Sequence, residues 1–171
     1  MYNIGDLIVY GKTGVCRVEG IKPIDPEGTG EEVLYYALNP LYRPGTAFVP
    51  VNSDKVQLRP IISRKEVEEL IEKIPSIDVK AYYNSSLSQL IEHYEKSFSS
   101  HSCLDLIKLT MSLYEKRRNL EEQNRKFGVV DGRFMKKAEE LLFGEFAAVL
   151  EIPIEDVPDY IASRVGDEYL E

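Results

Sequence analysis

The apolar pattern of the chain changes near residue 60, and this change limits the fold more than any other feature. From residue 4 to about 59, apolar residues come in short runs separated by Gly, Pro, Asn and Asp, as in strands and turns. From Ser63 onward they recur at helical spacing, after a capping box formed by Ser63 and Glu66. The sequence therefore predicts an α+β chain with the β part first, divided into domains over residues 1–60 and 61–171.

Five short strands are predicted in the first domain, over 6–10, 14–21, 32–39, 46–51 and 55–59. So many strands in so short a segment favour a small, strongly bent antiparallel barrel, because closure removes exposed edges. We expect Gly14 in the tight first turn and a longer loop over 22–32. Pro50 interrupts the fourth strand and marks it as an edge or a bulge. An edge strand offers free backbone groups that another protein can bind.

The second domain is predicted to be a bundle of about five helices. The first three are expected over 63–74, about 80–97 and 102 to about 125. A break at 127–132 precedes a fourth helix, and a short final helix lies within 152–165, with Pro153 near its first turn.

The formal net charge of −8 on 171 residues argues by itself against a polyanionic partner. The charge is unevenly distributed, because residues 108–137 hold nine basic and four acidic side chains, whereas residues 138–171 hold one basic and ten acidic. This pattern fits either a partner-binding surface or ordinary solvated helix faces. The chain has no apolar run long enough to span a bilayer and no secretory leader pattern, so we expect a cytoplasmic protein, and a monomer.

The residues predict no catalytic site. The two histidines, His93 and His101, belong to no metal-binding or nucleophile motif, and GKTG at 11–14 lacks the first glycine of a phosphate-binding loop. The two cysteines, Cys16 and Cys103, have no metal-ligand spacing and are expected to be buried thiols. We therefore expect a protein that is not an enzyme and has no cofactor or metal.

Basic side chains gather on both sides of the break at 127–132. They are Arg118, Arg125, Arg133, Lys136 and Lys137. The first two are seven residues apart, so they are predicted to share one helix face with Tyr114. These groups fit a phosphate backbone, or else they form ordinary ion pairs at i,i+4 spacing, as Lys136 would with Glu140.

The string IGDLIVYGKTGVCRVEGI, followed by EVLYYAL and FVPVNS, resembles the CarD/CdnL family of bacterial transcription regulators. This N-terminal module is also similar to the polymerase-interaction domain of transcription-repair coupling factor. The shared pattern is G-D-x-(V/I)-V-Y at 5–10, a turn glycine at 14, a strand ending near 21 and V-P at 49–50. The string KKAEELLFGEFAAVL also resembles the family's penultimate helix, with Gly144 and Glu145 matching its G-E.

The resemblance implies a Tudor-like or SH3-like barrel that binds the β subunit of bacterial RNA polymerase. It also implies a helical domain that contacts promoter DNA at the upstream edge of the melted bubble and modulates open-complex stability. Tethering to polymerase raises the local concentration of a weak, non-specific or shape-based DNA-binding surface, so an acidic chain is compatible with this role.

The polymerase-contacting arginines of the family have no match here. The aligned positions fall near Ile24 and Phe48, which predicts an interface more apolar than usual, with charge supplied by Lys22 or Arg43. The expected polymerase-binding residues are Lys22, Ile24, Arg43, Phe48, Val49 and Pro50.

The family's wedge tryptophan is also missing, because this chain contains no Trp. Val79 takes its place in the alignment and is too small to stack on a base, so either Tyr82 or Tyr83 substitutes or the wedge is absent. The expected DNA-binding residues are Val79, Lys80, Tyr82, Tyr83, Asn84, Arg118, Arg125, Arg133, Lys136 and Lys137. The alternative hypothesis is a polymerase-binding protein scaffold without DNA contact.

Overall fold

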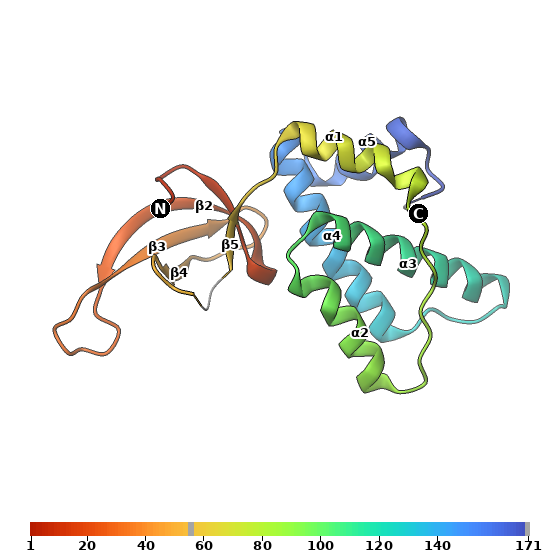
Figure 1. The fold of residues 1–171 in the computed structure, drawn as a ribbon, viewed down its shortest axis with the longest axis horizontal. Coiled ribbons are helices and arrows are strands. Elements are labelled where there is room, and N and C mark those ends of the chain that lie inside the picture. Colours follow the sequence, from red (N-terminus) through yellow and green to blue (C-terminus); the bar gives the residue numbers. More distant parts are fainter. Residues whose placement is uncertain (55–56, 170–171) are drawn as a thin grey trace. The chain divides into compact units, whose positions relative to one another are not determined.

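A computed structural model describes residues 1–54 and 57–169 of the chain. The chain divides into two compact units, Met1–Ile61 and Ile62–Glu171, and each is described by itself (Figure 1). Five strands are followed by five α-helices, which confirms the predicted α+β class with the β part first.

The first unit is one antiparallel sheet with the strand order β4-β3-β2-β1-β5. The strands are β1 (Leu7–Tyr10), β2 (Gly14–Ile24), β3 (Val33–Pro40), β4 (Ala47–Pro50) and β5 (Leu58–Pro60). Each matches a predicted strand, although the first two residues of the predicted strand 55–59 lie outside the described residues. Within the described strands no ladder joins β4 to β5, so the expected closure is not seen and these two strands are the sheet edges.

The first turn differs slightly from the prediction. A 3-10 turn over Gly11–Thr13 joins β1 to β2, and Gly14 follows it as the first residue of β2, with φ at 93°. This left-handed conformation favours glycine. The next loop is shorter than expected because β2 continues to Ile24. Within that loop the carboxylate of Asp25 accepts hydrogen bonds from the N–H groups of Thr29 and Gly30, at 3.1 and 2.8 Å.

The core of the first unit lies on the inner face of the sheet. Its buried members are Ile8, Cys16, Val18, Tyr36, Leu38 and Val49. Burial raises the pKa of the Cys16 thiol to about 11, so the group packs here in its neutral form. Both cysteines are buried thiols that form no disulfide within the described residues, as predicted.

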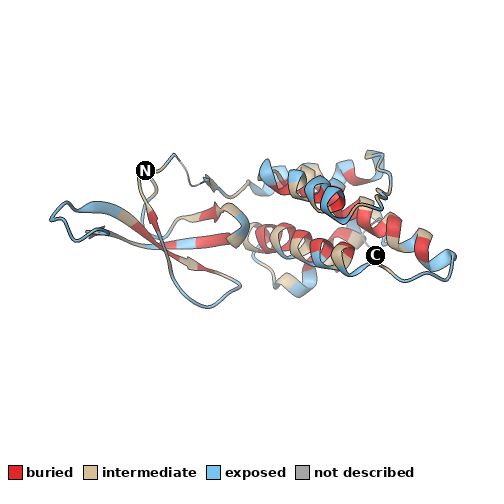
Figure 2. Cartoon of the chain, turned by 90° about the horizontal axis from the view of Figure 1, so that it is seen from below, coloured by how far each residue is buried: buried red, intermediate tan, exposed pale blue. Residues whose placement is uncertain are grey.

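The second unit contains the helices α1 (Arg64–Lys73), α2 (Leu87–Ser99), α3 (Cys103–Glu122), α4 (Val129–Leu150) and α5 (Val157–Val165). The long helices α3 and α4 pack against each other, α2 packs against both, and α1 packs against α5 (Figure 1). Buried residues line the sides of the helices that face one another (Figure 2). The predicted capping box of α1 is present, with Glu66 N–H donating to Ser63 Oγ at 3.1 Å and Ser63 N–H donating to Glu66 Oε2 at 2.7 Å.

The second helix begins later than predicted. Residues 77–86, which we call the strap, contain no helix, and α2 starts only at Leu87. Local bonds compete with helix formation here, because Asn84 Oδ1 accepts from the N–H of Ser86 at 2.9 Å. The carbonyl of Lys80 is also taken, since it accepts from Ser112 Oγ on α3 at 2.7 Å.

Two other helix ends also correct the prediction. Helix α3 ends at Glu122, and Asn124 adopts a left-handed φ of 55°, so Arg125 is not on a helix face shared with Arg118. Helix α5 starts at Val157, after a 3-10 turn, and Pro158 rather than Pro153 lies in its first turn.

Glu145 of α4 ties the start of the second unit to the bundle. Its carboxylate is buried, and Oε2 accepts from the N–H of Ile62 at 3.0 Å while Oε1 accepts from the Cys103 thiol at 3.2 Å. Cys103 is the first residue of α3, so the negative charge also lies at the positive end of a helix dipole. These contacts give Glu145, the second residue of the matched G-E pair, a structural role.

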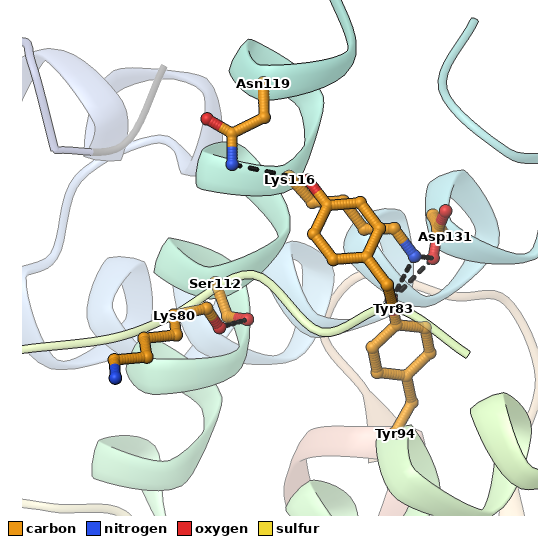
Figure 3. A network of polar contacts seen from close by, with 7 residues as sticks. All are labelled: Lys80, Tyr83, Tyr94, Ser112, Lys116, Asn119 and Asp131. Carbon is orange, nitrogen blue, oxygen red and sulfur yellow. Dashed lines mark hydrogen bonds and ion pairs between the residues drawn. The ribbon is translucent and has the colours of Figure 1, made fainter.

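A second buried polar group joins three helices. Lys116 Nζ of α3 lies 3.0 Å from Asp131 Oδ1 of α4 and 3.4 Å from Tyr94 Oη of α2. The Tyr94 hydroxyl donates to the same Asp131 oxygen at 2.5 Å (Figure 3). We call these residues the buried trio, since the side chains of Lys116 and Asp131 are only 7% and 6% exposed. Burial, together with the bond to Asp131, raises the pKa of Tyr94 above its usual range, so the phenol remains a donor.

Gly128, the N-cap of α4, is expected to tolerate no side chain. A Cβ there would lie 2.8 Å from Asp131 Oδ2, and this carboxylate cannot easily move because it belongs to the buried trio. We expect Gly128→Ala to lower the free energy of unfolding of the second unit by about 1–3 kcal/mol. Urea denaturation of the full chain, followed by helical circular dichroism, measures this change.

Gly132→Ala is the matched control on the same helix. A Cβ at Gly132 meets only Phe127 Cδ2, at an ordinary 3.9 Å. Alanine is therefore expected to raise stability by about 0.5–1 kcal/mol, as for other helix-interior glycines. Equal effects of the two substitutions would contradict the steric explanation.

Candidate partner-binding surfaces

The outer face of β2, β3 and β4 carries most of the predicted polymerase-binding residues. Directly opposed residues of an antiparallel ladder share a face. The register opposes Lys22 to Tyr35 and Tyr35 to Pro50, and it opposes Ile24 to Val33. We call this surface the β face. It is distinct from the inner face that carries the core.

Phe48 is the most prominent residue of the β face. It is 50% exposed and lies opposite Ala37, which in turn lies opposite Gly20. Because Gly20 and Ala37 are small, they form a small floor, a shallow area of the surface beside the Phe48 ring. The aliphatic part of the Lys22 side chain lies over this area, since its Cε is 3.8 Å from where a Cβ of Gly20 would be. The result is an apolar surface bordered by one ammonium group.

Val49 does not belong to this surface, which corrects the prediction. It lies opposite Tyr36 on the inner face and is 1% exposed, so it packs in the core and no partner can touch its side chain. Arg43 lies in the exposed segment between β3 and β4. The prediction missed Val33 and Tyr35, although period-2 alternation from Phe48 and its partners could have placed them on the same face.

Within the described residues, the edge strand β4 also has backbone groups that no neighbouring strand pairs with. The N–H of Val51 donates to the Leu34 carbonyl at 2.9 Å. Hydrogen-bonded and non-hydrogen-bonded pairs alternate along an antiparallel ladder, so Leu34–Val51 and Tyr36–Val49 are hydrogen-bonded pairs. The backbone groups of Phe48 and Pro50 therefore point away from β3. Phe48 offers one donor and one acceptor, whereas Pro50 offers only its carbonyl.

The strap forms a second candidate surface along α3. Tyr83 is 51% exposed, and its hydroxyl accepts from Asn119 Nδ2 at 3.3 Å (Figure 3). The ammonium of Lys116 lies 5.1 Å from the centre of the Tyr83 ring. A cation–π contact to a buried charge thus holds an exposed aromatic ring in place. Lys80 is exposed on the same strap.

Tyr82 is less accessible than its neighbour. Its ring stacks on His93 with the centroids 3.5 Å apart, and its hydroxyl accepts from Asn84 Nδ2 at 3.0 Å. Burial lowers the pKa of His93, and the positive charges of Lys96 and Lys116 lower it further. The imidazole is therefore neutral at pH 7, and this stack is a contact between uncharged rings.

Val79 and Arg118 line one pocket of about 380 Å³ between the strap, α3 and the end of the chain. Val79 is half-buried and packs against the helical core. Arg118 is exposed and pairs with Glu115 at 3.2 Å. Tyr114, predicted on the same face, is buried and donates its hydroxyl to Glu139 of α4.

The remaining predicted cations lie beyond α3. Arg125 is exposed in the segment between α3 and α4, and Arg133 and Lys136 are exposed on α4. Lys137 is half-buried, with its ammonium 5.1 Å from the centre of the Phe98 ring on α2. The strap carries Lys80 and Tyr83, and α4 carries Arg133 and Lys136. Lys116 of α3 links these two elements, because its ammonium lies 5.1 Å from the centre of the Tyr83 ring and 3.0 Å from Asp131 Oδ1 of α4.

Among residues 1–54 and 57–169, no three His, Cys, Asp or Glu side chains are placed to hold a metal ion. In the same residues, no helix has the length and apolar character needed to cross a membrane.

Comparison with known proteins assigns the first unit. Residues 2–62 match the family model described as the CarD-like/TRCF RID domain. The first unit thus resembles this domain family over nearly its whole length. Domains of this family serve protein interaction rather than catalysis. The match ends where the second unit begins, and no curated protein matches the chain.

Proposed function

We propose that this protein is a transcription regulator of the CarD/CdnL type. Its β face binds the β subunit of bacterial RNA polymerase, and its helical unit contacts promoter DNA and modulates the stability of the open complex. The observation that carries the proposal is the match of residues 2–62 to the CarD-like/TRCF RID domain, a domain type that binds this subunit.

The geometry of the first unit supports a protein partner. The β face combines an exposed aromatic ring with the small floor of Gly20 and Ala37, and buried aromatic anchors dominate the energy of many interfaces. The free edge of β4 adds backbone groups, so a partner strand can extend the sheet by pairing with Phe48. The missing N–H of Pro50 limits that pairing to a short stretch.

The geometry of the second unit supports nucleic acid as its partner. Tyr83 is an exposed, fixed ring with Lys80 on the same strap, and aromatic rings stack on any base. Arg133 and Lys136 supply exposed cations on α4 for phosphates. Of the two tyrosines that could replace the family's wedge tryptophan, Tyr83 is the accessible one, because Tyr82 stacks on His93.

Phe48→Ala is expected to weaken binding of the full chain to a polymerase β-subunit fragment at least about tenfold, because truncating a buried aromatic hot spot costs about 2 kcal/mol or more. Surface plasmon resonance measures the dissociation constant. Leu34→Ala is the matched control, since Leu34 is 48% exposed on the opposite side of β3. It is expected to change the constant less than about twofold. Equal losses in both variants would show that the β face is not the interface.

Charge reversal on α4 separates DNA contact from the scaffold alternative. Arg133→Glu/Lys136→Glu is expected to weaken duplex binding by about tenfold or more and to change the open-complex half-life, because two phosphate contacts become repulsive. Arg64→Glu/Lys65→Glu reverses two exposed cations at the start of α1 and is the control. Half-lives are measured by competitor challenge on a promoter. If the α4 variant matches wild type while still binding polymerase, the protein is the scaffold without DNA contact.

Tyr83→Ala tests the stacking role without changing charge. Loss of one base–aromatic stack costs about 1–3 kcal/mol, so the effect on open-complex lifetime should fall about fivefold or more. Tyr83→Phe keeps the ring and loses only the contact with Asn119, so it should remain within about twofold of wild type. If the phenylalanine variant is as defective as the alanine variant, the ring does not act by stacking.

A further inference from the structure

Residues 166–169, which follow α5, fold back onto the predicted DNA-contacting surface. Helix α5 stops at Gly166, whose φ of 95° turns the chain out of the helix. The residues that follow reach α3, where Arg118 Nη1 donates to the backbone carbonyl of Glu168 at 3.1 Å. We call Gly166–Tyr169 the tail.

The tail covers residues from both the strap and α3. Glu168 and Tyr169 form one wall of the 380 Å³ pocket whose other walls include Val79 of the strap and Arg118 of α3. The Tyr169 side chain is half-buried and packs against the helical core. The tail is thus seated on this surface through a backbone hydrogen bond and an apolar anchor.

The contacts of Arg118 leave its guanidinium poorly available to a phosphate. One arm donates to the tail carbonyl, and the other lies 3.2 Å from Glu115 Oε2. A bidentate Arg–phosphate contact needs two adjacent N–H groups to point at the phosphate. Asp167 and Glu168 are exposed, so the tail also carries two carboxylates on the residue that contacts this guanidinium and on its neighbour.

We propose that the tail is an autoinhibitory segment: in the free protein it occupies the surface of Arg118 and Val79, and nucleic-acid phosphate must displace it. The proposal rests on the proposed DNA contact. It explains how acidic residues at the chain end act directly on a binding surface instead of only lowering the net charge. Once the tail is displaced from this surface, its carboxylates lie farther from the bound duplex and repel the phosphates less.

The test measures binding of the full chain to a labelled duplex by fluorescence anisotropy. Asp167→Asn/Glu168→Gln removes both charges and keeps the backbone carbonyl and Tyr169. We expect it to bind about threefold to tenfold tighter than wild type at about 50 mM salt, with the difference shrinking as salt screens the charges. A chain ending at Val165 should gain at least as much, provided that circular dichroism shows it folded.

Glu155→Gln/Asp156→Asn is the matched control. These exposed acids lie before the first residue of α5, roughly 13 Å from the tail by the length of that nine-residue helix. At about 0.15 M salt this variant should bind within about 1.5-fold of wild type, because the Debye length of about 8 Å is shorter than this separation. In addition, saturating duplex should speed hydrogen exchange of the tail amides in the wild-type chain.

The outcomes separate this proposal from the proposed function. If wild type binds duplex but the tail variant binds equally or more weakly, the tail is not a competitor and the DNA contact stands. If the control variant gains as much as the tail variant, the effect is net charge and the tail proposal is wrong. If no variant binds duplex at low salt, both the DNA contact and the tail proposal fail.

Discussion

The second unit depends on one buried ionic group, the trio of Lys116, Asp131 and Tyr94. Each residue comes from a different helix, and the carboxylate receives both the ammonium and the phenol. Replacing one member would leave an uncompensated charge or an unpaired donor in the core, which is commonly costlier than the pair itself is stabilising. The trio therefore fixes the relative positions of α2, α3 and α4. The same ammonium also lies beneath the ring of Tyr83. The position of the exposed tyrosine is thus coupled to the packing of the core.

The first unit has a different organisation. Most of its core is an apolar layer on the inner face of the sheet, and Val9 and Val15 are buried on the opposite face. The β face remains exposed at Phe48, and within the described residues no strand pairs with the outer edge of β4. An uncovered edge is usually protected by charge, a proline or a partner. Here Pro50 limits the edge, and Phe48 stands beside it on the β face. In the first unit, the candidate binding groups are the exposed face and edge of the sheet. In the second unit, they include an exposed tyrosine ring that a buried lysine holds in place.

Much of this architecture could be predicted from local sequence. Short apolar runs bounded by turn residues placed the five described strands, and the Ser63–Glu66 capping box placed the start of α1, because both signals depend on neighbouring residues. The strap could not be found this way. Its apolar spacing resembles a helix, but the side chains of Asn84 and Ser112 occupy its backbone groups, and Ser112 lies on another helix. Lys116 was likewise not predicted as a buried residue, since nothing in its local sequence distinguishes it from a surface lysine.

The candidate sites also contain parts that local sequence can predict and parts that it cannot. Strand alternation is enough to assign Phe48 and Val49 to opposite faces, so the mistaken choice of Val49 was avoidable. The tail was not foreseeable, because its contact with Arg118 spans fifty residues of sequence. The charge pattern already contained the two parts of that contact, a basic segment and an acidic end, but only the fold brings them together.

Tethering to polymerase would allow a DNA-binding surface to function even though the protein's own tail competes for it. A unit bound to polymerase meets nearby duplex at an effective concentration that can reach the millimolar range, so weak intrinsic affinity is sufficient there. Away from polymerase, the same weak affinity is reduced further by the tail, and the large excess of non-specific DNA would bind little of the protein. On the proposed function, the acidic tail and the basic helices are therefore complementary. On that proposal, the first unit selects the place of action, and the tail suppresses binding elsewhere.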